Sequence, residues 1–190
     1  MTSSKDDKWN EPFNPMIEEE FLKKYNIKKT TKNTLFIDMD GVLVDFDKGY
    51  ENYFGYKPTK VDDNVDWALV NGVESYYANI PPMEDFKELW EGIAHYNPII
   101  LTGVPKEVPS AADDKRKWVD KHIGKSQLMI TCLSKDKSLH MKNKGDILID
   151  DWTKYQHLWI ERGGRWITHM SAEQSLAELE MSILMDDIFV

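Results

Sequence analysis

The chain has 190 residues, of which 41% are hydrophobic and 30% charged, and this balance excludes both a disordered protein and a low-complexity array. Its net charge of −9 disfavours a protein that coats a nucleic-acid polymer, because binding to a polyanion needs clustered Lys and Arg. Apolar runs stay well short of the ~20 residues of a membrane span, and residues 1–15 lack the apolar centre of a signal peptide. We therefore expect no membrane partner and a cytoplasmic protein, or one in the host cytoplasm if a phage encodes it. The single cysteine, Cys132, excludes an internal disulfide and a thiolate zinc cluster.

Taken in chain order, the sequence predicts an N-terminal arm followed by alternating strands and helices. Residues 1–14 lack hydrophobic periodicity, whereas apolar residues between 16 and 27 recur at a helical spacing. Strands are predicted at 34–39, 98–101, 127–131, 146–149 and 165–168. Helices are predicted at 84–96, 111–123, 153–162 and 171–184. This alternation indicates an α/β fold, a Rossmann-like three-layer α/β/α arrangement around a parallel sheet.

The segment 47–80 interrupts the alternation directly after the first strand. It is rich in Tyr, Trp, Asn and Asp, as a small inserted domain would be. We therefore divide the chain into an arm and helix at 1–30, a core at 31–46 and 81–190, and a small cap at 47–80. The last helix either packs on the core or pairs with a second subunit in a homodimer, and its apolar spacing allows both.

Carboxylates follow two of the predicted strands. Asp38 and Asp40 end the first strand and Gly41 allows a sharp turn, while Asp150 and Asp151 end the fourth. Because parallel strands carry their carboxyl ends to the same edge of a sheet, these four side chains should converge there. Four carboxylates would repel one another without a cation, and oxygen ligands with no Cys or His beside them favour Mg²⁺.

A hydroxyl and lysines are expected beside this magnesium site. Thr102 and Gly103 end the second strand, and a lysine-rich loop at 135–144 precedes the fourth. Residues 106–145 hold ten basic and five acidic side chains, which could draw in a small anionic substrate or could equally be a solvated surface. Donors and positive charge beside Mg²⁺ suit a phosphate group, so phosphoryl transfer is the chemistry we expect.

Three motifs resemble those of the haloacid dehalogenase superfamily. Residues 36–46 (FIDMDGVLVDF) resemble its first motif, hhhDxDGhhxDF, residues 99–102 (IILT) its second, and residues 146–151 (DILIDD) its fourth. The resemblance spans about residues 34–169. It implies the superfamily's fold, with a cap inserted after the first strand, and its use of Mg²⁺.

The resemblance also implies a role for each motif residue. Asp38 would attack phosphorus to form an aspartyl-phosphate, and Asp40 would act as general acid and base while its backbone carbonyl helps to hold Mg²⁺. Thr102 would donate a hydrogen bond to the phosphate. Asp150 or Asp151 would complete the metal site, with Asp151 slightly preferred.

Within the superfamily, the chain is most similar to the 5'(3')-deoxyribonucleotidases and their phage and bacterial relatives. The similarity lies in residues 75–83 (SYYANIPPM), residues 115–124 (KRKWVDKHIG) and the SKDK…GDILIDD passage. On this alignment Lys137 is the phosphate lysine, with Lys142 and Lys144 as alternatives.

The second motif departs from these relatives. Where they tend to have Thr-Ser-Pro, this chain has Thr102 and Gly103 before Val104, and so lacks one hydroxyl near the phosphate. We still place Gly103 among the phosphate-binding positions. In the cap, Phe46 and Trp67 are the aromatic residues we expect to face a substrate, since a nucleobase can stack on any flat side chain. Each could instead be part of the cap's own core.

The leading interpretation is a magnesium-dependent phosphatase that hydrolyses nucleoside monophosphates. A second interpretation keeps the chemistry and changes the substrate to another small phosphomonoester or to a nucleic-acid 3'-phosphate end. A third, of another class, is a binding or regulatory protein that keeps the fold and has little turnover.

Overall fold

The sheet at the centre of the fold has five parallel strands in the order β3-β2-β1-β4-β5. The computed structural model describes residues 33–58 and 65–188. Its strands are β1 (Leu35–Ile37), β2 (Ile99–Gly103), β3 (Met129–Cys132), β4 (Ile147–Asp150) and β5 (Arg165–Thr168). Because β1 lies between β2 and β4, the strand order reverses there, and ligands of such sheets bind outside the carboxyl ends of the strands at this reversal.

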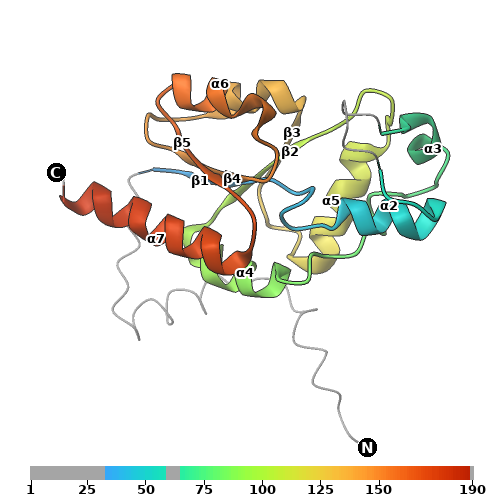
Figure 1. Cartoon of the computed structure of the whole chain (residues 1–190), viewed down its shortest axis with the longest axis horizontal. Coiled ribbons are helices and arrows are strands. Elements are labelled where there is room, and N and C mark those ends of the chain that lie inside the picture. Colours follow the sequence, from blue (N-terminus) through green and yellow to red (C-terminus); the bar gives the residue numbers. More distant parts are fainter. Residues whose placement is uncertain (1–32, 59–64, 189–190) are drawn as a thin grey trace, which may run out of the picture.

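Helices cover both faces of the sheet (Figure 1), so its central strands are buried on both sides and are continuous hydrophobic runs. Leu35 and Ile37 of β1 face a large core that includes the buried faces of α4 (Phe86–Ile93), α5 (Ala111–His122) and α7 (Ala172–Ile188). Phe36 faces the other way, into a smaller core where its ring meets Trp159 of α6 (Gln156–Glu161) edge-on at 5.4 Å. The result is the three-layer arrangement that the sequence predicts.

The predicted elements agree with the structure apart from their ends. The helix predicted at 84–96 is α4 followed by the 3₁₀ turn η3 (Ala94–Tyr96), and that predicted at 153–162 is η5 (Thr153–Tyr155) followed by α6. The lysine-rich loop contains an unpredicted 3₁₀ helix, η4 (Ser134–His140). The helix predicted at 16–27 lies outside the described residues. No helix in the described part of the chain is long and apolar enough to cross a membrane.

The inserted segment contains two short helices, α2 (Phe46–Phe54) and α3 (Trp67–Asn71), which lie at the same end of the molecule as α5 (Figure 1). Its two connections to the core run side by side, because the Asp45 N–H donates to the Pro81 carbonyl at 2.9 Å and the Met83 N–H donates to the Leu43 carbonyl at 3.0 Å. Trp118 of α5 donates its indole N–H to the carbonyl of Ile80 at 2.9 Å, which joins α5 to this connection.

Helix α7 packs on the core in the structure. Leu179 is buried, and Leu176 packs so closely on Gly92 of α4 that a Cβ at residue 92 would lie 2.4 Å from a Leu176 methyl. Met181 and Leu184 on the same helix are exposed. Core packing thus accounts for part of its apolar residues, and pairing with a second subunit stays a prediction.

Candidate active site

The carboxyl ends of β1 and β4 bring three of the four predicted carboxylates together. Asp38 directly follows β1, and its N–H donates to the Ile149 carbonyl of β4 at 2.9 Å, so the strand pairing itself sets its position. Side-chain oxygens of Asp38, Asp150 and Asp151 all lie within 4.8 Å of one another. Asp38 and Asp150 are buried, and Asp151 is half-buried. This is the edge at which the sequence predicts a metal and a phosphate.

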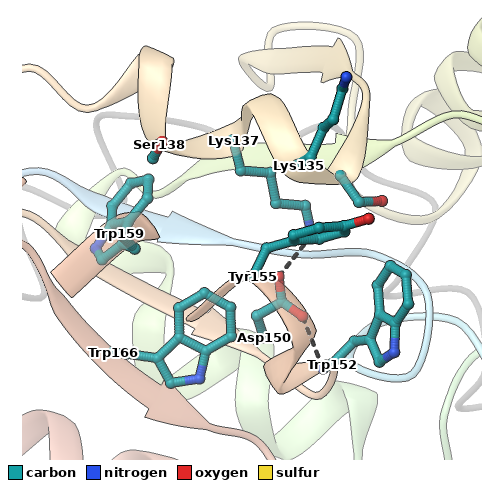
Figure 2. Close-up of a pocket in the computed structure, with 9 residues that line it drawn as sticks. Lys135, Lys137, Ser138, Asp150, Trp152, Tyr155, Trp159 and Trp166 are labelled. Atoms are coloured by element: carbon teal, nitrogen blue, oxygen red, sulfur yellow. Dashed lines mark hydrogen bonds and ion pairs between the residues drawn. The ribbon is translucent and has the colours of Figure 1, made fainter. Parts of the chain in front are cut away.

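Lys137 lies between two of these carboxylates. Its Nζ is 3.0 Å from Asp38 Oδ1 and 2.6 Å from Asp150 Oδ2, and the side chain is buried. Figure 2 shows it reaching down from η4 to Asp150. Burial lowers the pKa of Lys137, but the two carboxylates outweigh burial and raise it above the ordinary value, so this lysine is charged at neutral pH.

Asp150 has both carboxylate oxygens engaged by the protein. Oδ2 accepts from Lys137, and Oδ1 accepts from the Trp152 backbone N–H at 2.9 Å (Figure 2). Burial, together with the negative charge of Asp38, raises the pKa of Asp150 to about 6 despite the lysine. Its bonds therefore hold Lys137 and the start of the following loop in place.

Gly41 makes room for Asp151. Its φ is +73°, a conformation that favours glycine, and a Cβ at this position would lie 2.1 Å from Asp151 Oδ2. The loop after β1 therefore lies against the Asp151 carboxylate, and only a residue without a side chain allows this approach. The oxygens gathered here are hard ligands with a net negative charge, which fits a magnesium ion.

Asp40 points to a different partner. Its Oδ2 accepts a hydrogen bond from Lys115 Nζ at 2.6 Å, so its carboxylate is outside the three-carboxylate cluster. Among the described residues, its buried Oδ1 has no hydrogen-bond partner. Burial and the nearby Asp38 raise the pKa of Asp40, while Lys115 lowers it in part. An Asp with a raised pKa can carry a proton, as a general acid must.

Lys115 is the site residue that sequence reasoning missed. It lies on α5, and its side chain is completely buried. Besides Asp40, it donates to Thr102 Oγ1 at 2.8 Å and to the Gly103 carbonyl at 2.7 Å. The sequence signal that points to this helix is the resemblance of residues 115–124 to the nucleotidase relatives.

Gly103 is also a place of close approach. A Cβ there would lie 2.2 Å from the hydroxyl of Ser134, the first residue of η4. The missing side chain at position 103 thus leaves space that the Ser134 hydroxyl occupies from the neighbouring loop. The sequence records the loss of a hydroxyl in the second motif, but it does not show that another hydroxyl lies beside that position.

A cavity of about 780 Å³ opens over the carboxylates, large enough for a small-molecule ligand. Asp38 and Asp40 line its floor, and Phe46 and Trp67 line its wall on the side of the inserted segment. The two rings are 6.0 Å apart. The remaining lining includes Lys135, Trp152, Lys154 and Tyr155.

The other aromatic residues near Phe46 belong largely to the interior. Tyr50, Tyr76 and Tyr77 are buried, and the rings of all three lie about 6 Å from that of Phe46. Of these, only Tyr77 also lines the cavity. Lys142 and Lys144 are exposed and do not line it. Lys137 does not line the cavity either, but it is the one of these three lysines that the structure brings to Asp38, at 3.0 Å.

Comparisons with known proteins agree with one another. A family model described as "5' nucleotidase, deoxy (Pyrimidine), cytosolic type C protein" matches residues 52–171. A protein of Vibrio phage KVP40, provisionally named a 5'(3')-deoxyribonucleotidase, is 34% identical to this chain over 128 residues, which are 67% of this chain and 71% of the phage protein.

A solved structure described as a HAD hydrolase of family IA, variant 3, from Entamoeba histolytica also resembles this chain. The match covers 78% of this chain and 88% of the Entamoeba chain. Its TM-score to this chain is 0.44, at 12% sequence identity.

Proposed function

Since the chain belongs to the family of cytosolic type C 5'-nucleotidases of the haloacid dehalogenase type, and is thus a phosphoric monoester hydrolase, we propose that it is a magnesium-dependent phosphatase acting on nucleoside monophosphates. The observation that carries this proposal is the convergence of Asp38, Lys137, Asp150 and Asp151 at the carboxyl edge of the sheet, where Asp38 and Asp151 also line the cavity. Asp38 and Asp40 precede the stretch that the family model matches, so their roles are supported by this geometry and by the first motif.

The first half of the reaction transfers the phosphoryl group to Asp38. A carboxylate oxygen of Asp38 attacks phosphorus, and the bond from phosphorus to the nucleoside oxygen breaks. Asp40 gives its proton to that leaving oxygen. Lys137 and the Thr102 hydroxyl face the charge that spreads over the phosphoryl oxygens. Mg²⁺, when bound, would neutralise part of this negative charge and orient the phosphate.

The second half regenerates the enzyme. Asp40, now a carboxylate, takes a proton from a water molecule, whose oxygen attacks phosphorus. The bond between phosphorus and Asp38 breaks, which releases phosphate and restores the Asp38 carboxylate. The raised pKa of Asp40 supports both roles, because the same group must first carry the proton and then accept it.

The bonding around the fourth motif supports Asp151 as the metal ligand of that pair. Both oxygens of Asp150 already accept hydrogen bonds, from Lys137 and from the Trp152 N–H. Asp151 lies in the cluster with an oxygen against Gly41. Asp38 and Asp151 would hold the ion together with the Asp40 backbone carbonyl, while Asp150 keeps Lys137 in position.

The inserted segment would act as a small cap that covers the substrate and excludes water. Phe46 and Trp67 face the cavity from it, and they would stack on the nucleobase. This role distinguishes the nucleotide proposal from a general phosphatase, because a sugar phosphate has no aromatic base to stack on.

The test is phosphate release from ribo- and deoxyribonucleoside monophosphates with 5'- or 3'-phosphates, sugar phosphates and a 3'-phosphorylated oligonucleotide, each with and without Mg²⁺. We expect metal-dependent hydrolysis of a mononucleotide subset. Asp38→Asn should abolish it, whereas Asp113→Asn, the same change at an exposed position of α5, should leave it intact.

Acid quenching during turnover of ³²P-labelled substrate should trap a hydroxylamine-sensitive phosphoprotein that Asp38→Asn lacks. Preferred hydrolysis of sugar phosphates or of the oligonucleotide end would replace the substrate assignment. Absence of turnover throughout the panel by a folded, Mg²⁺-binding protein would contradict the phosphatase proposal.

A further inference from the structure

A buried lysine joins two elements of the site that the reaction must keep in register. Lys115 is 0% exposed, and its nearest charged group is Asp40, 75 positions earlier in the chain. Burying an ammonium group is costly unless it is fully hydrogen-bonded and paired, so its contacts define its role.

All three N–H donors of Lys115 are used inside the protein. An ammonium group has three N–H bonds, and here the acceptors are Asp40 Oδ2 at 2.6 Å, Thr102 Oγ1 at 2.8 Å and the Gly103 carbonyl at 2.7 Å. The Nζ also lies 4.9 Å from the centre of the Tyr77 ring. With its donors saturated, Lys115 has none left for a substrate phosphate.

The same bonds determine how two neighbours can act. Thr102 Oγ1 accepts from Lys115, and its own contact to the Gly103 carbonyl is at the 3.5 Å limit of a hydrogen bond, so its hydroxyl hydrogen can turn toward the phosphate. Asp40 is held through Oδ2, which leaves Oδ1, buried and without a hydrogen-bond partner among the described residues, for proton transfer.

We propose that Lys115 is a positioning residue that holds the general acid Asp40 and the phosphate ligand Thr102 in register at the end of β2. This inference rests on the proposed phosphatase function. Loss of Lys115 should slow the reaction most where proton donation matters most, which is the departure of a poor leaving group. A nucleoside alkoxide must be protonated as it leaves, whereas 4-nitrophenolate leaves without help.

The experiment compares kcat/KM for the best mononucleotide and for 4-nitrophenyl phosphate in wild type and Lys115→Met. The parameter kcat/KM is chosen because it ends with departure of the leaving group and excludes the later hydrolysis of the phosphoenzyme. We expect kcat/KM for the nucleotide to fall at least about tenfold further than that for the aryl phosphate, since general acids contribute about 10²–10⁴-fold. Asp40→Asn should show the same selectivity.

Lys121→Met, at an exposed position of the same helix, should change neither value. Lys115→Gln, which keeps donors without the charge, provides a second variant if Lys115→Met does not fold. Equal losses for both substrates in a folded variant, or no loss at all, would overturn the inference. Failure of the phosphatase function would be visible separately, because wild type would then hydrolyse neither ester.

Discussion

Replacing Gly41 with alanine tests whether the loop after β1 and the Asp151 carboxylate form one site. Two effects combine at this position. The backbone has φ +73°, and a new Cβ would lie 2.1 Å from Asp151 Oδ2. Alanine in such a left-handed conformation costs about 1–2 kcal/mol. To reach even the 3.0 Å that real Cβ contacts respect, Asp151 must retreat by about 1 Å.

Gly55→Ala is the matched control. Gly55 ends α2 with φ +80°, and a Cβ there would meet no atom within 4 Å. Its variant should therefore show the backbone penalty alone, which for a chain of this length is a fall in Tm of roughly 2–8 °C. Gly41→Ala should lose at least as much, and the difference between the two variants isolates the displacement of Asp151.

The assay is Mg²⁺-dependent phosphate release, followed as a function of metal concentration, alongside thermal unfolding. Because a misplacement of about 1 Å in a catalytic site costs roughly 100-fold in rate, we expect a loss of that order for Gly41→Ala and less than about threefold for Gly55→Ala. The magnesium concentration for half-activation should rise at least about tenfold in Gly41→Ala alone. Equal activities and metal responses in the two variants would refute this reasoning.

Lys137→Met leaves the buried Asp38 carboxylate without its cation, so the free energy of unfolding without metal should fall by about 3 kcal/mol. Mg²⁺ should then raise the Tm of the variant more than that of wild type. An equal rise in Tm in both proteins would argue against a shared site. Burial and the charge of Lys121 lower the pKa of His122 to about 4, from an ordinary value of 6.5. The unfolded chain therefore takes up the proton more readily than the folded one, and stability falls as the pH drops from about 6.5 toward 4. The free energy of unfolding in urea should fall between pH 7 and pH 5 by about 1 kcal/mol more in wild type than in His122→Phe, allowing for solvent screening. The same pH dependence in both proteins would exclude this histidine as the cause. Gly103→Ala should destabilise by about 1–3 kcal/mol through contact with Ser134, and adding Ser134→Gly should recover most of that loss in the double variant.

The sequence was sufficient to predict the strands and the carboxylates at their ends. Runs such as residues 34–39 and 146–149 are apolar without interruption, which indicates strands buried on both faces. Parallel strands share a carboxyl edge, so Asp38 and Asp151 could be expected near each other although more than a hundred residues separate them. These predictions depend only on local pattern and on a general rule of sheet topology.

The role of a single lysine could not be predicted in this way. Three lysines of the same helix, Lys115, Lys117 and Lys121, are the same residue type in one amphipathic stretch. The structure buries Lys115 and leaves the other two exposed. The orientation of α5 against the ends of β1 and β2 decides which of them points inward. That orientation comes from packing, including the bond from Trp118 to the carbonyl of Ile80.

The choice among the loop lysines has the same origin. Lys137, Lys142 and Lys144 all precede β4, and η4 brings only Lys137 to Asp38 and Asp150. The position of the Ser134 hydroxyl beside Gly103 also depends on this short helix. By itself, the sequence determined which chemical groups are present and which edge of the sheet they share. Only the tertiary structure decided which cation neutralises which carboxylate, because the paired residues come from different segments of the chain that are brought together by folding.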